Sequence, residues 1–113
     1  MHTDYGIQVR SSDRWLCVSL YGEIDHHSAL FLREDLDELI LRERPQRLVL
    51  DLSRIEFMDS SGLGLLLGRY RLLRELGGEM AVDPVNERVE KILRLAGMER
   101  FFEIGRALKG ERL

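Results

Sequence analysis

The sequence feature that most constrains the fold is a short apolar run, residues 47–52 (RLVLDL), which lies between two amphipathic stretches. Its length and its leucine- and valine-rich composition are typical of a buried strand in a parallel sheet. The stretch before it follows Asp25, a good helix N-cap, and predicts a helix with one apolar stripe. That stripe consists of Ala29, Leu32, Leu36, Leu39 and Ile40. A helix, a buried strand and a second helix in succession predict parallel βαβ packing.

The rest of the chain continues this alternation. Residues 7–9 and 15–21 predict two strands joined by a polar turn, and 80–82 and 101–104 predict two more. A second helix follows the DSSG string at residues 59–62 and ends at Gly77-Gly78, and a third stops near Gly97. The predicted apolar stripe of the second helix is Leu63, Leu66, Leu67, Tyr70 and Leu73. These elements predict a single α/β domain over residues 1–113, with its core at about 7–104, a small mixed β-sheet and helices packed against it.

Composition excludes several classes of partner and site. The formal net charge is -3, with acidic and basic residues mixed along the chain, so nothing favours binding to nucleic acid or to an anionic membrane. Cys17 is the only cysteine, which excludes an intramolecular disulfide and a C-x-x-C motif. The first residues show no cationic segment followed by an apolar one, so no signal peptide is expected, and no apolar run is long enough to span a bilayer. A cytoplasmic protein is therefore expected.

Two polar segments, residues 22–29 (GEIDHHSA) and 57–64 (FMDSSGLG), each lie where a strand region passes into a helix. Such junctions collect at one edge of a parallel sheet, so the two segments are expected to be neighbours. From spacing alone, Asp25, Asp59 and the serines are helix caps at least as readily as recognition residues. Gly64 and Gly68, one turn apart, fit either packing on the sheet or a partner-facing surface.

The strings GEIDHHSA, FMDSSGLGLLLGRY and GGEM closely resemble the sporulation-type anti-sigma factor antagonists (anti-anti-sigma factors) of spore-forming bacteria. These proteins belong to the sulfate-transporter and anti-sigma-antagonist (STAS) domain family, and the resemblance runs from about Ile7 to Phe102 with the same order of segments. It implies a small mixed sheet with helices packed against it, as the pattern predicts. It also implies phosphorylation of the first serine of the DSSG string, Ser60, by an anti-sigma factor that is itself a serine kinase with bound nucleotide.

The resemblance further implies a switch. The unphosphorylated protein binds the anti-sigma factor and releases the sigma factor, phosphorylation of Ser60 ends this binding, and a PP2C-type serine phosphatase restores it. The protein itself is then no enzyme and has no catalytic residue, cofactor or metal. The residues expected to bind the partner are Glu23, Asp25, His26, His27, Ser28, Asp59, Ser61, Gly62 and Gly64.

Other functions fit less of the sequence. The chain could be a STAS scaffold module that works without phosphorylation, or a receiver-like domain phosphorylated on Asp51 at the end of its strand, with Glu23 and Asp25 as the acidic pair. No strand-ending lysine completes a receiver, since Lys91 falls in a predicted helix. A serine hydrolase lacks its G-x-S-x-G elbow, a nucleotide hydrolase lacks its Walker loop, and His26-His27 lacks a third metal ligand.

Overall fold

The computed structural model describes residues 5–105, which form a five-stranded sheet, three α-helices and one short 3-10 helix. The strands lie in the order β1-β2-β3-β4-β5, antiparallel between β1 and β2 and parallel from there on, which confirms the α/β fold with parallel βαβ units. In chain order the elements are β1 (Tyr5–Ser11), β2 (Trp15–Ile24), α1 (His26–Glu43), β3 (Arg47–Met58), α2 (Ser60–Glu75), β4 (Glu79–Val85), α3 (Glu87–Leu95), the 3-10 helix (Met98–Arg100) and β5 (Glu103–Ile104).

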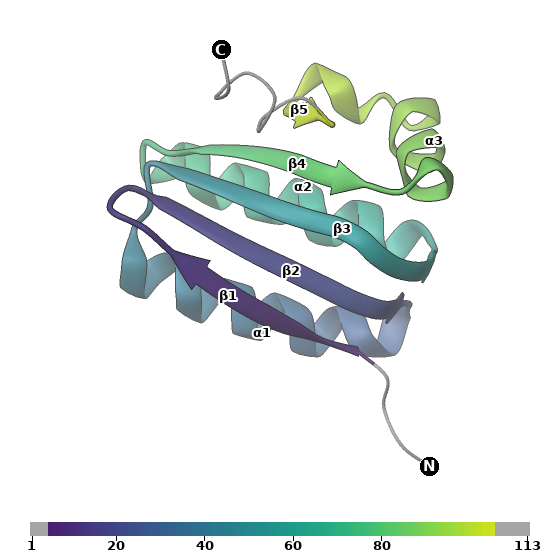
Figure 1. Cartoon of the computed structure of the whole chain (residues 1–113), viewed down its shortest axis with the longest axis horizontal. Helices are drawn as coiled ribbons and strands as arrows, with labels where there is room; N and C mark the ends of the chain where they lie inside the picture. The colour runs from purple at the N-terminus through teal and green to yellow at the C-terminus, as the bar shows by residue number, and fades with distance from the viewer. Residues whose placement is uncertain (1–4, 106–113) are drawn as a thin grey trace.

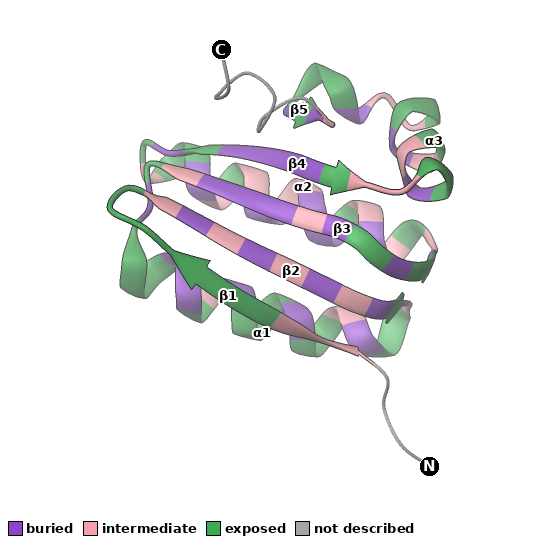
Figure 2. Cartoon of the chain, viewed as in Figure 1, coloured by how far each residue is buried: buried purple, intermediate pink, exposed green. Residues whose placement is uncertain are grey.

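The helices cover one face of the sheet. Figure 1 shows α1 and α2 side by side behind the sheet, with α3 beyond the end of β4. Burial alternates along β2 (Figure 2), because neighbouring side chains of a strand point to opposite faces. Leu16, Val18 and Leu20 point toward the helices and are at most 1% exposed, whereas Cys17 and Ser19 face the other side and are half-buried. The second face of the sheet is therefore partly accessible along β2, whereas Val49 and Ala81 on the same face are at most 2% exposed.

Strand β3 is longer than the sequence predicts. It continues past Leu52 to Met58, because β2 keeps pairing with it as far as Ile24 opposite Met58. Two register shifts in this ladder, one of them beside Gly22 at φ +96°, let the strands stay paired while they bend. Asp51 is consequently in the middle of a strand, and the prediction that it ends one is wrong.

The buried stripe of α2 also differs from the prediction. Its core-facing residues include Leu66 and Leu73 as expected, but Leu63, Leu67 and Tyr70 are only half-buried. The complete buried set is Gly62, Leu65, Leu66, Arg69 and Leu73. Leucines occupy nearly every direction around the first turns of this helix, so apolar periodicity alone does not define which side packs on the sheet.

A buried ion pair joins α1 to α2. The Nε atom of Arg69 lies 2.8 Å from Oδ1 of Asp37, and the Arg69 side chain is 9% exposed. The N–H does not point at the carboxylate, so the contact is ionic rather than a hydrogen bond. Burial lowers the pKa of Arg69, while the charge of Asp37 opposes that shift. The contact joins α1 to α2 between a buried Arg69 side chain and an Asp37 side chain that is 31% exposed.

Within residues 5–105, none of the helices has both the length and the apolar character that crossing a lipid bilayer requires.

Candidate functional site

The two polar segments singled out in the sequence meet at one edge of the sheet, the carboxyl edge, where β2 and β3 end. Glu23 pairs with Phe57 and Ile24 with Met58 in the parallel ladder. The backbone N–H of Asp59 then donates to the carbonyl of Ile24 over 3.2 Å, which ties the two strand-to-helix junctions together. The expected proximity of the two segments is confirmed.

Helix α1 begins with a closed capping box. Oδ1 of Asp25 accepts the N–H of Ser28 over 2.9 Å, and Oγ of Ser28 accepts the N–H of Asp25 over 3.0 Å. The Ser28 hydroxyl also donates to the carbonyl of Glu23 over 2.7 Å. The Ser28 N–H, which bonds the charged carboxylate, holds the pKa of Asp25 below its usual value.

Ser28 is therefore a structural residue. It is 2% exposed, and its hydroxyl both donates and accepts within the chain. Its side chain lies beneath the surface, so a contact of Ser28 with a partner stays a prediction that only its backbone could fulfil. Asp25, by contrast, is half-exposed, so its carboxylate both caps the helix and remains accessible.

Helix α2 begins with a simpler cap. Oδ1 of Asp59 accepts the N–H of Ser61 over 2.8 Å. Ser60, the first residue of the helix, is exposed, and within residues 5–105 its hydroxyl forms no hydrogen bond. Ser61 is half-buried beside it. The arrangement leaves one hydroxyl accessible and unbonded at the positive end of a helix dipole.

The glycines of α2 fall into two groups. Gly62 is buried, and a Cβ placed on it would lie 2.2 Å from Cγ of Met58 and 3.3 Å from Cγ2 of Ile24. Close packing inside the chain thus accounts for Gly62, and its contact with a partner stays a prediction. A Cβ on Gly64 or Gly68 would meet nothing within 4 Å. The interpretation that these two pack on the sheet is wrong, since both face away from it.

Both histidines lie at the start of α1, and both are exposed. The ring of His27 packs edge-on against Phe31, with ring centroids 5.2 Å apart, and its centroid lies 6.5 Å from that of Tyr5. No cluster of three or more potential metal ligands occurs among residues 5–105.

The sequence reasoning missed the apolar residues near this edge. Phe57 is 47% exposed at the end of β3, and Leu30 and Phe31 on α1 are 53% and 47% exposed. Their exposure could not be read from the pattern, because Phe57 follows a register shift and α1 has apolar residues on more than one side. Glu23, opposite Phe57, is exposed.

The structure contradicts the receiver-like alternative. Asp51 lies in mid-strand, and its Oδ1 accepts both the N–H and the hydroxyl of Ser53, over 2.9 and 2.6 Å. Glu23 belongs to the other end of the ladder, where it pairs with Phe57, and Lys91 is in α3. The groups that a phosphorylated aspartate needs are therefore not assembled around Asp51.

Comparison with known proteins gives a consistent family. A model described as "STAS domain" matches residues 6–110. The anti-sigma F factor antagonist of Paenibacillus polymyxa is 46% identical over 89 residues, which cover 79% of this chain and 76% of that protein. The anti-sigma-B factor antagonist of Bacillus subtilis (strain 168) is 29% identical and is covered to 94%, with 92% of this chain aligned.

Solved structures agree with this. The unphosphorylated form of the anti-sigma factor antagonist SpoIIAA matches with a TM-score of 0.76 and 26% identity, over 93% of this chain and 92% of that one. The phosphorylated form of the Bacillus cell fate determinant SpoIIAA matches with a TM-score of 0.68 and the same identity, over 95% of this chain and 97% of that one.

Proposed function

This chain belongs to the STAS domain family, and we propose that it is an anti-sigma factor antagonist that is switched off by phosphorylation of Ser60. In its unphosphorylated form it binds an anti-sigma factor and releases the sigma factor held there, so that sigma-dependent transcription begins. The named relatives are regulatory proteins of this kind rather than enzymes, which supports a protein that is acted on and performs no chemistry of its own.

The observation that carries the proposal is the accessible, unbonded hydroxyl of Ser60 at the first turn of α2. Of the serines at the carboxyl edge, Ser28 is buried and fully hydrogen-bonded, and Ser61 is half-buried. Of these three serines, Ser60 has the hydroxyl oxygen that is most accessible to a kinase. The match to SpoIIAA structures in unphosphorylated and phosphorylated forms supports a fold that survives this modification.

We define the docking surface by the accessible residues of the carboxyl edge and the first turns of its two helices. Its members are Glu23, Asp25, His26, His27, Asp59, Ser60, Ser61 and Gly64.

The glycines of α2 support a partner that approaches this surface closely. Gly64 lies one turn from Ser60, and Gly68 lies one turn further along the same outward side. Glycine in a helix interior is less favourable than alanine by about 1 kcal/mol. Since neither glycine is required by contacts inside the chain, close approach of a partner's backbone explains why no side chain is present there.

Phosphorylation acts on docking rather than on folding. A phosphoserine carries about -1.5 to -2 charges, which the helix dipole favours at an N-terminus and the neighbouring Asp59 carboxylate opposes. These contributions partly cancel, so the fold persists. Moving a binding equilibrium from 99:1 to 1:99 takes about 5.5 kcal/mol, which a desolvated and sterically excluded phosphate in an interface can supply.

The partners proposed for this switch are those that the resemblance to sporulation-type antagonists implies. The kinase is the anti-sigma factor itself, a serine kinase with bound nucleotide, and a PP2C-type serine phosphatase returns Ser60 to its free form. All three act in the cytoplasm.

The proposal is tested by sigma-factor release. A complex of the cognate anti-sigma factor with its sigma factor is titrated with this protein, and free sigma factor is measured by size-exclusion chromatography. The unphosphorylated protein is expected to release the sigma factor, and the phosphorylated protein is not. Ser60→Ala serves as the control, because it keeps release activity in the presence of ATP. Equal release by both forms of the parent would instead identify a scaffold module that works without phosphorylation.

A further inference from the structure

The last part of β3, residues 53–58, has a paired strand on one side only. Its ladder with β4 ends at Leu52 opposite Val85, whereas its ladder with β2 continues to the end of the strand. This part of β3 leads directly into Asp59 and Ser60, so whatever holds it also contributes to placing the Ser60 hydroxyl. Backbone carbonyls on the side that β4 has left need hydrogen-bond donors from elsewhere.

Asn86, the N-cap residue of α3, supplies such a donor. Its Oδ1 accepts the N–H of Val89 over 2.9 Å, so the side chain caps the helix while its Nδ2 points back to β3. Nδ2 lies 2.9 Å from the carbonyl oxygen of Ile55, and 3.3 and 3.4 Å from those of Ser53 and Leu52. One side-chain amide thus takes the place of part of a strand and joins the start of α3 to β3.

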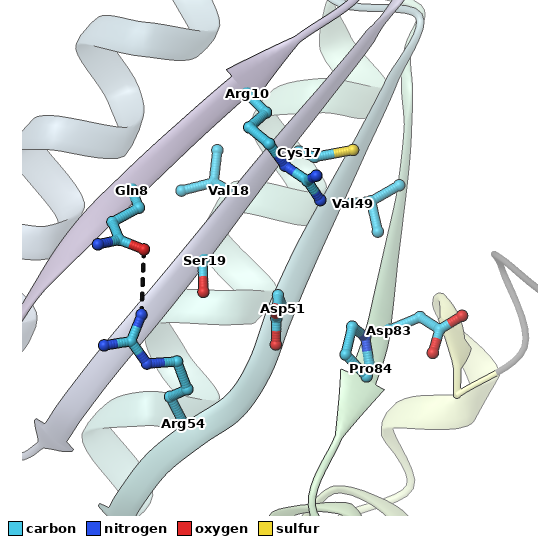
Figure 3. Close-up of a pocket in the computed structure, with 10 residues that line it drawn as sticks. All are labelled: Gln8, Arg10, Cys17, Val18, Ser19, Val49, Asp51, Arg54, Asp83 and Pro84. Atoms are coloured by element: carbon cyan, nitrogen blue, oxygen red, sulfur yellow. Dashed lines mark hydrogen bonds between the residues drawn. The ribbon is translucent and has the colours of Figure 1, made fainter.

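Two arginines hold the same part of β3. Nη1 of Arg88 donates to the carbonyl of Glu56 over 2.7 Å, again from the first turn of α3. Arg54 reaches across β2 in the other direction, where its Nη1 donates to Oε1 of Gln8 over 3.0 Å (Figure 3). Its guanidinium carbon also lies 5.0 Å from the centroid of the Tyr21 ring. On the side of α3, side chains therefore hold the end of β3 where β4 no longer pairs with it.

We propose that Asn86 is a positioning residue for the phosphorylation of Ser60, and that it acts through β3 rather than by contact with the kinase. The inference rests on the proposed function, in which a kinase aligns its nucleotide with the Ser60 hydroxyl. Such reactions depend strongly on geometry, and a displacement of about 1 Å can slow them about a hundredfold. The amide of Asn86 keeps residues 53–58 in one arrangement, and with them the start of α2.

The capping role of Asn86 can be separated from its contact with β3. Aspartate and serine cap a helix about as well as asparagine does. Aspartate has only acceptor oxygens when it is ionised, and the serine side chain is too short to bridge three carbonyls. Asn86→Asp therefore keeps the cap and removes the donor, and Asn86→Ser does the same without adding a charge. Both variants are expected to fold.

The first measurement needs no partner. Hydrogen exchange of the free chain, followed by NMR, reports on the amide of Asp59, which donates to the carbonyl of Ile24 over 3.2 Å. The amide of Val49, in the part of β3 that is paired on both sides, is the internal control. Both Asn86 variants should speed exchange at Asp59 by about tenfold relative to Val49, the effect of losing about one hydrogen bond.

The second measurement is single-turnover phosphorylation of Ser60 with ATP and an excess of the cognate anti-sigma factor kinase, at rising kinase concentration. Partial unfolding alone would raise the kinase concentration needed for half-saturation and leave the saturating rate unchanged, whereas a misplaced hydroxyl lowers the saturating rate. We expect that rate to fall by about tenfold or more in both Asn86 variants. Arg88→Gln, which loses only the bond to Glu56, should have a smaller effect in the same direction. Glu87→Gln, at an exposed neighbouring position, should match the parent.

An unchanged ratio of exchange at Asp59 and Val49 would overturn the inference. A saturating rate equal to that of the parent in both Asn86 variants would also overturn it, because Asn86 would then only stabilise the chain. A parent chain that the kinase does not phosphorylate would overturn the proposed function, and with it the inference, whatever the exchange ratio.

Discussion

The helices α1 and α2 start side by side at the carboxyl edge, and both start behind an aspartate cap. At α1 the cap is a closed box, in which Asp25 and Ser28 satisfy each other and the Ser28 hydroxyl is buried. At α2 the cap is a single hydrogen bond from the N–H of Ser61 to Asp59, and the hydroxyl of Ser60 remains free. We call the start of α1 the closed cap and the start of α2 the open cap. The closed cap has no free side-chain hydroxyl, whereas the open cap leaves the hydroxyl of Ser60 accessible.

The largest expected effect concerns the charge of the closed cap. Asp25→Asn should leave the fold nearly unchanged, because asparagine caps a helix about as well as aspartate. If the carboxylate also pairs with a cationic group of the anti-sigma factor, binding should weaken by about 2–5 kcal/mol. Titration calorimetry against the anti-sigma factor measures this, with thermal unfolding run in parallel. Unchanged affinity for the anti-sigma factor would mean that Asp25 only caps α1 and does not bind the partner.

A second prediction compares serines of the two caps. Ser28→Ala leaves the N–H of Asp25 and the carbonyl of Glu23 without their hydroxyl partner, and should destabilise the fold by about 1–3 kcal/mol. Ser61→Ala is the matched control, since the backbone N–H of Ser61, which Asp59 caps, remains. Chemical denaturation gives both values. Equal losses would show that the second cap is as closed as the first.

A third prediction separates the two sides of α2. Gly64→Ala should stabilise the fold by up to about 1 kcal/mol and weaken binding of the anti-sigma factor, because the new methyl group points outward. Gly62→Ala should destabilise by about 1–3 kcal/mol, because its methyl group collides with Met58. Denaturation and binding measured on the same samples distinguish the variants. A stabilised Gly64→Ala with full affinity would remove Gly64 from the docking surface.

The smallest expected effect concerns charge at the open cap. Ser60→Asp should change the free energy of unfolding by less than about 1 kcal/mol, because dipole attraction and repulsion from Asp59 offset each other at an exposed position. Denaturation midpoints of the variant and the parent test this. A midpoint far below that of the parent would mean that the modification acts by unfolding the start of α2.

Much of the fold was predictable from local pattern. Leu32, Leu36, Leu39 and Ile40 are buried as their 3.6-residue spacing predicts, and Gly77 ends α2 in a left-handed conformation with φ +83°. The end of β3 was not predictable, because its last residues are held by pairing with a distant segment rather than by their own polarity. Burial of Arg69 likewise depends on Asp37 of another helix.

The location of the candidate site was predictable from the sequence, but which of its residues are structural and which are accessible was not. Capping residue types and strand-to-helix junctions were sufficient to bring residues 22–29 and 57–64 together. They were not sufficient to tell Ser28 from Ser60, since both are serines in a helix's first turn. That difference arises from depth: one hydroxyl reaches the carbonyl of Glu23 inside the chain, and the other points to solvent.

The central claim is that the free hydroxyl of the open cap is the one modified. The most direct measurement is mass-spectrometric mapping of the phosphate after incubation with the cognate anti-sigma factor kinase and ATP, with and without acid treatment. The account predicts one acid-stable phosphate on Ser60 and none on Ser28 or Ser61. A phosphate mapped to Ser61, or an acid-labile phosphate on Asp51, would contradict it.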